Sequence, residues 1–422
     1  NHICSVCQKK QNKLHGFANP FTFYTLDKPG FAANFFKQIS SWKNYPICSD
    51  CAIKIEKGLD YIENNLNRYF WGYTYYLIPR MVFDNENEYL KKALNILNKF
   101  NYEKNDKKIS AYEDNFFKYI SKEENYFFID LFFYQKNNSE FNIKLMLEEI
   151  FPSRLRLLFS DIPEKLNNKS IFNEVLTRKE GKTKVKKSLE FNFGILQEFF
   201  EDDFYDLIYR VFEGKKIDVE TLYNKFVISI KKARNEGLKK STYYVNEIIY
   251  KAIMTLYYFQ ELELINYNKN FSFEVKMDNE PKKETSKSFN LSKLQIFIEE
   301  NKSFLDSEIK IGIFSVGILV KIVMSLQYRK LNSTPFENKL RGLNINAEHI
   351  KRIYIEAIEK LTQYLSSGAY QDLREFIAKH FVANSYLLPK MSNDEITFYF
   401  VSGMEIAKTF AGEIEDLEEN NI

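Results

Sequence analysis

The 422-residue chain is long enough for two or three domains, and its 45% hydrophobic and 28% charged residues are ordinary for a water-soluble protein. A net charge of +3 excludes a strong overall positive field, so any nucleic-acid surface must be a local patch. The most apolar run, Ile311–Tyr328, is interrupted by Lys321 and flanked by Lys310 and Arg329, which favours a buried helix over a membrane span. No secretory signal is recognisable, and we expect a cytoplasmic setting without a membrane partner.

All the cysteines lie in the first 51 residues, as two Cys-x-x-Cys pairs: Cys4, Cys7, Cys48 and Cys51. Each pair points two thiolates at one spot, so two pairs supply the four-sulfur shell of a structural Zn²⁺ ribbon with a long insertion. Two disulfides, a redox pair or unrelated cysteines are alternatives, but disulfides suit small secreted domains and a redox motif needs only one pair. His2 or His15 could each replace one sulfur. A closed shell of this kind would hold structure and perform no catalysis.

The insertion between the cysteine pairs has few apolar repeats of its own. Phe21, Phe23 and Thr25 alternate as in a strand, and Asp27–Gly30 has the composition of a turn. After the second pair, apolar residues recur at helical spacing as far as Leu66, so the second pair is expected to open a helix.

Patterns between residues 68 and 166 predict a mixed region of strands and helices. Runs of aromatic and β-branched residues indicate strands, apolar residues at helical spacing indicate a helix, and Pro152 suits the first turn of a second helix. The expected elements are a strand at Arg68–Phe83, a helix at Glu86–Phe100, a hairpin of Tyr126–Tyr134 with Glu140–Leu147 around a turn at Gln135–Ser139, and a helix from Pro152 to about Leu166.

A basic segment follows at 178–187. It carries one acid and six basic residues around Gly181: Arg178, Lys179, Lys182, Lys184, Lys186 and Lys187. No apolar period runs through it, so a solvated loop and a loop that grips phosphate both remain open. The heavy use of Lys, Asn, Ile, Phe and Tyr resembles the codon bias of an AT-rich genome, which would also explain lysine clusters.

The remainder of the chain is expected to be helical. From Glu198 to Ile265 the pattern predicts helices with breaks at Gly214 and Gly237, and with a long run at Thr242–Leu264. The polar stretch Asn266–Ser288 is the best candidate for a domain boundary. Five further helices are expected at Leu291–Asp306, Ile309–Leu331, Ala347–Leu365, Tyr370–Phe381 and Asn393–Phe410.

These patterns predict an α+β N-terminal part with a structural zinc ribbon, followed by a C-terminal all-α helical bundle. The expected domains are 1–68, a zinc-binding segment with its following helix; 69–265, an α+β and helical middle region; 266–288, a linker; 289–412, the helical bundle; and 413–422, an acidic tail.

No familiar catalytic motif accompanies this architecture. Among the four histidines, His349 and His380 fall within helical patterns, and no histidine has hydrolase or metal-enzyme spacing. There is no Walker loop and no Gly-x-Gly-x-x-Gly. Carboxylates brought together by folding could still form a two-metal nuclease, so this class stays an alternative to a protein without enzymatic activity.

Several short stretches resemble the large subunit of type I-B CRISPR Cascade complexes. Near the N-terminus these are Phe23–Phe31, Pro46–Cys51 and Gly72–Pro79; in the C-terminal part they are Phe314–Val320 with Gln327, Pro335–Leu343 and Asp394–Gly403. Each stretch is short, and their order and combination carry the resemblance. Large subunits of this family have residues ahead of the first cysteine pair, whereas this sequence begins at it.

The resemblance implies a protein without catalytic activity in an RNA-guided surveillance complex, with guide RNA, target DNA, the other Cascade subunits and a helicase-nuclease as partners. Such a subunit helps to recognise a short flanking motif, holds the opened strands and recruits the nuclease, while guide pairing carries the sequence specificity. Helical spacing could place further basic residues along the displaced strand or scatter them around a solvated face, and both interpretations stay open for Arg329, Lys330, Lys339, Arg341, Lys351 and Arg352. A zinc-ribbon accessory factor in transcription or recombination is the alternative binding function.

The resemblance also implies that the small subunit can be translated from within the large-subunit message. Met277 lies in the polar stretch ahead of the helix expected at Leu291, so a product of residues 277–422 could form a helical domain of its own.

Overall fold

The structure is a computed structural model that describes residues 2–16, 18, 20, 38–82, 88–98, 109–137, 140–173, 175–178, 184–240, 243–273, 289–340, 342–365 and 368–410. The chain forms two compact units. Unit 1 comprises Asn1–Pro163, Asn192–Gln197 and Asp202–Glu213; unit 2 comprises Glu164–Phe191, Glu198–Glu201 and Gly214–Ile422. The strand and turn predicted at 21–30, Met277 and the acidic tail lie outside the described residues.

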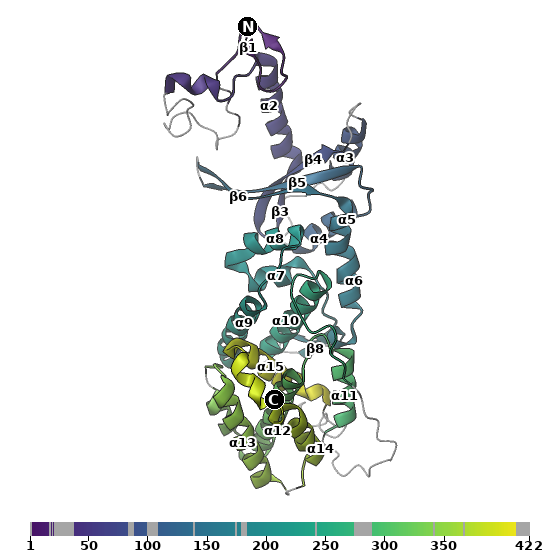
Figure 1. Ribbon diagram of the computed structural model, residues 1–422, viewed down its shortest axis with the longest axis vertical. Coiled ribbons are helices and arrows are strands. Elements are labelled where there is room, and N and C mark those ends of the chain that lie inside the picture. Colours follow the sequence, from purple (N-terminus) through teal and green to yellow (C-terminus); the bar gives the residue numbers. More distant parts are fainter. Residues whose placement is uncertain are drawn as a thin grey trace. The chain divides into compact units, whose positions relative to one another are not determined.

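Unit 1 combines a small N-terminal module with an antiparallel sheet and helices (Figure 1). The module contains β1 (His2–Ile3), β2 (Lys10–Gln11), the 3-10 helix η2 (Gln38–Lys43) and α2 (Ser49–Tyr61), which continues as the π-helical η3 (Ile62–Leu66). The remaining elements are β3 (Asn67–Phe70), β4 (Tyr73–Met81), α3 (Glu88–Asn98), α4 (Ile109–Ile120), β5 (Phe127–Asn137), β6 (Glu140–Ile150), α5 (Pro152–Arg156), the π-helical η4 (Leu157–Asp161) and α8 (Phe204–Glu213). The predicted β5–β6 hairpin and the predicted helix from Pro152 are confirmed.

The sheet is an antiparallel meander in the order β3-β4-β5-β6. The single strand predicted at Arg68–Phe83 is wrong, because the chain reverses at Trp71–Gly72 and forms two paired strands. Both turn residues have positive φ, 47° and 88°, as a two-residue hairpin turn requires. Tryptophan tolerates this conformation here because its indole Nε1 donates to Asp114 Oδ1 at 3.0 Å and its ring packs against Gly194.

An aromatic cluster forms the core beneath one face of this sheet, where α4 and α8 lie (Figure 1). The Phe70 ring meets Phe117 of α4 at 5.5 Å and Phe193 at 5.3 Å between ring centroids. Phe159 stacks on Phe193 at 4.5 Å. Many of the sequence's phenylalanines therefore serve packing, which needs no ligand to explain them.

Three elements lie across the bounds of the two units: α6 (Ile162–Asn167), α7 (Phe193–Phe199) and the 3-10 helix η6 (Glu201–Asp203). Unit 2 begins with the 3-10 helix η5 (Ser170–Phe172) and the two-stranded ribbon of β7 (Val175–Arg178) and β8 (Lys184–Lys187). Its helices are α9 (Val219–Lys240), α10 (Tyr243–Glu261), α11 (Leu291–Glu300), α12 (Glu308–Leu331), η7 (Pro335–Leu340), α13 (Ala347–Tyr364), α14 (Gln371–Ile377), the π-helical η8 (Ala378–Val382), η9 (Ser385–Lys390), α15 (Asn393–Ile406) and η10 (Ala407–Phe410).

The helices predicted beyond the polar stretch are confirmed, although the one predicted at Leu291–Asp306 already ends at Glu300. Asn290, Ser307, Asn346 and Ser392 each cap a helix N-terminus by accepting a backbone N–H three residues on. The break predicted at Gly237 is wrong, because this glycine lies within α9. The predicted fold class, α+β followed by a mainly helical C-terminal part, is confirmed.

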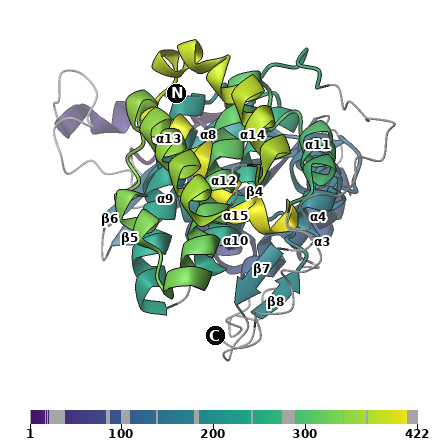
Figure 2. The same cartoon turned by 90° about the horizontal axis from the view of Figure 1, so that it is seen from below.

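Helices α12 and α15 form the centre of unit 2, with α9, α13 and α14 around them (Figure 2). Among the described helices, α12 is the one long and apolar enough to cross a membrane, but 78% of its most apolar window is buried inside the protein. The two helices approach through glycines: a Cβ on Gly317 would lie 2.1 Å from Phe400 O, and one on Gly403 would lie 1.9 Å from Phe314 O. The expectation of a buried helix over a membrane span agrees with this packing.

Polar contacts join α9 to the same core. Tyr223 and Tyr399 pair through their hydroxyls at 3.0 Å. Nearby, the Lys310 ammonium lies 2.7 Å from Asp306 and 3.4 Å from Glu395, and 5.2 Å from the centroid of the Tyr399 ring. Residues on both sides of the predicted 266–288 linker therefore pack into one core. The predicted domain bounds themselves stay a prediction.

Candidate metal centre and nucleic-acid interface

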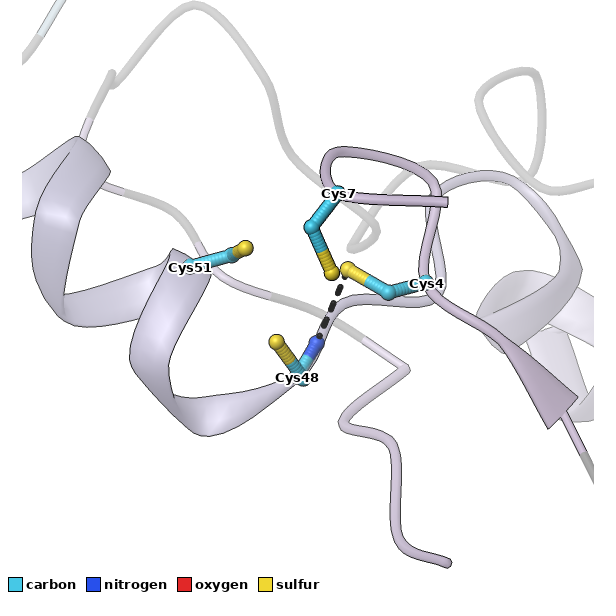
Figure 3. A group of neighbouring side chains, drawn as sticks. All are labelled: Cys4, Cys7, Cys48 and Cys51. Carbon is cyan, nitrogen blue, oxygen red and sulfur yellow. Dashed lines mark hydrogen bonds between the residues drawn. The ribbon is translucent and has the colours of Figure 1, made fainter. Parts of the chain in front are cut away.

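The four cysteines converge at one point in the N-terminal module (Figure 3). Cys4 and Cys7 come from the turn that follows β1, in which Cys4 N–H donates to Lys9 O at 3.1 Å and Gln8 N–H donates to Cys4 O at 3.0 Å. Gln8 has a φ of 57°, which lets the chain reverse over the pair. All four Sγ atoms lie within 4.8 Å of one another.

The second pair sits at the start of α2. Cys48 is the N-cap residue and Cys51 lies in the first turn, so both thiols face the helix end where unpaired N–H groups favour negative charge. The Cys48 N–H also donates to Cys4 Sγ at 3.4 Å, which joins the two pairs directly. His15 and Ile47 exchange backbone hydrogen bonds of 2.8 and 2.9 Å and hold the segments together.

The thiols of the cluster differ in acidity. Burial by itself would raise the pKa of the Cys4 thiol, but backbone N–H donors from Cys7, Cys48 and Val6 lower that pKa to about 6. The Cys51 thiol is less acidic, because a hydrogen bond with Cys48 and burial raise the pKa of Cys51 to about 12. Because the four thiols lie so close together, all four cannot readily become thiolates at once. A bound cation would offset the repulsion between their negative charges.

These residues fit a metal ion. Tetrahedral zinc with Zn–S bonds of about 2.3 Å places its sulfurs about 3.8 Å apart, which is compatible with the spacing here. His15 is not needed as a replacement ligand, because its Nε2 is hydrogen-bonded to Ser49 Oγ at 2.8 Å. Within the described parts of the chain, the cysteines are the only group of three or more His, Cys, Asp or Glu side chains close enough to share an ion.

The predicted basic segment lies partly in the β7–β8 ribbon of unit 2. The register pairs Arg178 with Lys184 and Leu176 with Lys186, and Lys187 is exposed. Lys179 and Lys182 lie outside the described residues. The ribbon also packs against α10. The interpretation of 178–187 as a loop is therefore wrong for its ends, which are strands.

The second basic set is spread over α12, η7 and α13 of unit 2. Lys330 donates to Tyr364 O, Lys339 pairs with Glu356, and Lys351 lies 2.9 Å from Glu348. Arg329 and Arg352 are exposed, and Arg341 lies outside the described residues. Part of the charge predicted to meet nucleic acid is thus already balanced by acids, and the role of the set stays a prediction.

Two domain families match the chain. Residues 1–150 match the central domain, and residues 191–418 the C-terminal domain, of the CRISPR-associated protein TM1802 family (cas_TM1802). The chain belongs to the cas_TM1802 family of CRISPR-associated proteins. No curated protein matches it. Membership implies other CRISPR-associated proteins and nucleic acid as partners.

One feature of this cas_TM1802 protein escaped the sequence reasoning. The segment Ser333–Leu343, which contains one of the stretches that carry the resemblance, lines a cavity of about 590 Å³ together with Lys231, Arg234 and Asn235 of α9. The two parts are about a hundred residues apart in the sequence, so no local pattern joins them. The basic run at the end of α9 was a signal that could have drawn attention to this surface.

Proposed function

We propose that the chain is the large subunit of a type I-B CRISPR surveillance complex, without catalytic activity of its own and acting in the cytoplasm. The observation that carries the proposal is the ordered match to two domains of one CRISPR-associated family over residues 1–150 and 191–418. In this role the subunit binds guide RNA and target DNA, helps to recognise the flanking motif, holds the opened strands and recruits the helicase-nuclease.

The metal in the proposal is zinc, held by Cys4, Cys7, Cys48 and Cys51. A four-sulfur shell has no open coordination position, so the ion would supply structure only. It would fix the turn after β1 to the start of α2. Surfaces that must meet nucleic acid in a set register benefit from such rigid support.

The absence of catalysis is part of the proposal. A two-metal nuclease needs several carboxylates around one site, and the residues that could share an ion in the described chain are the four cysteines. Incubation of the purified chain with labelled DNA and RNA, with Mg²⁺ or Mn²⁺, should leave both intact. Cleavage that disappears with chelator would overturn this part.

Co-purification tests the central claim. Expressed with the genes that adjoin its own, the tagged chain should retain guide RNA and the repeated backbone subunits through size-exclusion chromatography. An accessory factor of transcription or recombination would elute without guide RNA. That result would remove the Cascade assignment while leaving the family membership untouched.

The basic segment at 178–187 offers a second test of nucleic-acid binding. Reversal of Lys182, Lys184 and Lys186 to Glu should weaken DNA binding about equally for all sequences and reduce the salt slope by roughly one unit per lost phosphate contact. Binding measured at two salt concentrations decides the matter. Unchanged affinity at both salt concentrations would show that residues 178–187 are a solvated segment that does not contact phosphate.

A further inference from the structure

Two neighbouring cavities lie beside α9 within unit 2, and we treat them as the outer and inner parts of one cleft because they share four lining residues. The outer part, of about 590 Å³, has a polar lining that includes Lys231, Arg234, Asn235, Thr334, Glu337 and Asn338. The inner part, of about 280 Å³, shares Arg234, Thr334, Glu337 and Leu343 with it and reaches toward α12 and α15. Spaces of this size suit a small ligand or one unit of a polymer.

The outer part offers donors to an anion. Arg234 Nη2 lies 3.1 Å from Glu337 Oε1, and Thr334 Oγ1 donates to Glu337 Oε2 at 3.0 Å, so the acid is fixed while other guanidinium N–H groups remain. Among the described residues, the Lys231 side chain makes no hydrogen bond or ion pair. Two cations against one carboxylate leave this wall positive.

The inner part is different in character. It is walled by buried apolar side chains: Val245, Met324, Leu343, Val401 and Met404. Two charged side chains, Lys321 and Glu405, also line it. A flat ring with polar edges suits such a lining better than a purely aliphatic or purely charged group does.

Backbone strain marks the wall that both parts share. Leu343 has a φ of 41° directly after Gly342 at 81°, a left-handed conformation that strains a residue with a Cβ. Its side chain is nevertheless buried and lines both parts. Ile345 N–H, two residues on, is held by Thr397 Oγ1 at 3.1 Å, which anchors the strained turn to α15.

We propose that this cleft holds one nucleotide of a single strand, with its phosphate at Lys231 and Arg234 and its base turned into the inner part. Met324 and Met404 would cover the ring, and the Glu405 carboxylate would accept from an exocyclic amino group, which cytosine has and thymine lacks. The inference rests on the proposed function, because it assumes that the chain binds nucleic acid. It adds a site and a base preference to that function.

The test uses the full chain and three single-stranded 15-mers followed by fluorescence anisotropy: oligo-dC, oligo-dT and an abasic backbone of the same length. We expect dC to bind at least about fivefold more tightly than the abasic strand, because a sheltered base adds a contact that phosphates cannot supply. Thymine should fall between them, since its O4 faces the carboxylate.

Three variants assign the effect to the cleft. Lys231→Ala should weaken all three oligomers about equally and lower the salt slope by about one, whereas Lys232→Ala, an exposed neighbour outside the lining, should leave them unchanged. Glu405→Gln, which keeps size and shape, should bring the affinities for dC and dT together. Thermal melting confirms that each variant is folded.

The possible outcomes separate the two proposals. Tight binding with equal affinity for dC and the abasic strand, or a dC preference unchanged in Glu405→Gln, overturns the nucleotide site and leaves the proposed function standing. A folded wild-type chain that binds none of the oligomers, alone or assembled with guide RNA, overturns both.

Discussion

The N-terminal module and the C-terminal helices of this chain achieve a folded core in opposite ways. Of the 13 residues of α2, only Cys51 is buried, and beyond the cysteines the module's apolar core consists of Ile47 and a few partly buried residues. By contrast, 15 of the 24 residues of α12 are buried. One region is built around four converging sulfur atoms, which in our proposal hold a zinc ion, and the other around a close-packed apolar interior.

The difference predicts that the two regions fail for different reasons. The module should be insensitive to changes of apolar volume and should collapse when its ligand set is broken. The helical core should be indifferent to chelators and sensitive to single methyl groups. Four experiments test this difference, and they are given in order of decreasing expected effect.

Loss of one ligand should be the most damaging change. Cys48→Ser leaves three sulfurs, and because structural zinc contributes about 10–16 kcal/mol in small zinc domains, residues 2–66 should unfold while unit 2 survives. Metal analysis with limited proteolysis checks this. Ser5→Ala, in the first Cys-x-x-Cys turn, is the control and should retain one zinc per chain. The absence of zinc from wild-type chain purified without chelator would contradict the prediction.

Removal of α9 and α10 together should have the next largest effect. The hypothesis that residues 277–422 fold alone must account for Phe398, which meets Phe226 at 5.4 Å, and Tyr399, which meets Tyr223. Exposure of two such rings costs roughly 3–6 kcal/mol. A fragment from Met277 should therefore be helical but melt well below one from Gly214. Equal melting temperatures would show that α9 and α10 contribute little to the stability of the C-terminal helices.

A single methyl group at the helix crossing should cost less. Gly403→Ala places a Cβ against Phe314 O, so α12 and α15 must separate, and we expect a loss of about 3 kcal/mol in the free energy of unfolding. The matched control is Gly58→Ala in α2, where nothing lies within 4 Å and helix propensity should add about 1 kcal/mol. Similar effects at both positions would refute the contrast.

The smallest effect concerns acid. Burial lowers the pKa of the His380 imidazole, although its hydrogen bond to Glu308 opposes this and Lys379 lies nearby. The unfolded chain then binds more protons near pH 6, so stability should fall as the pH drops below about 6.5, by about 1.4 kcal/mol for each unit of pKa difference. His380→Phe should flatten this dependence in urea unfolding at pH 7.5 and 5.5. An unchanged pH dependence would exclude His380 as its source.

Much of the fold was predictable where chemistry or periodicity is local. Two Cys-x-x-Cys pairs fix a ligand set whatever lies between them, and the caps at Ser307, Asn346 and Ser392 mark helix starts in the sequence itself. The turn at Trp71 was missed because its positive φ depends on Asp114 and Gly194, which are remote in sequence.

Other errors share that cause. Gly237 resembles a helix break, but α9 continues through it. Strand β8 was missed because its lysines lack the apolar alternation of a strand, and its pairing with β7, which packs against α10, provides what the pattern does not. The cleft needs α9 and Ser333–Leu343 together, a juxtaposition that only the tertiary fold creates.

The crossing of α12 and α15 has a consequence for synthesis on the ribosome. Helix α12 is complete at Leu331, but its main partner begins only at Asn393. At about 5–20 residues per second, the most apolar helix of the chain waits for several seconds before α15 can cover it. The N-terminal module, by contrast, has its last cysteine within the first 51 residues of this sequence. Yield in a heterologous host should accordingly respond more to chaperones that shield nascent helices than to added zinc.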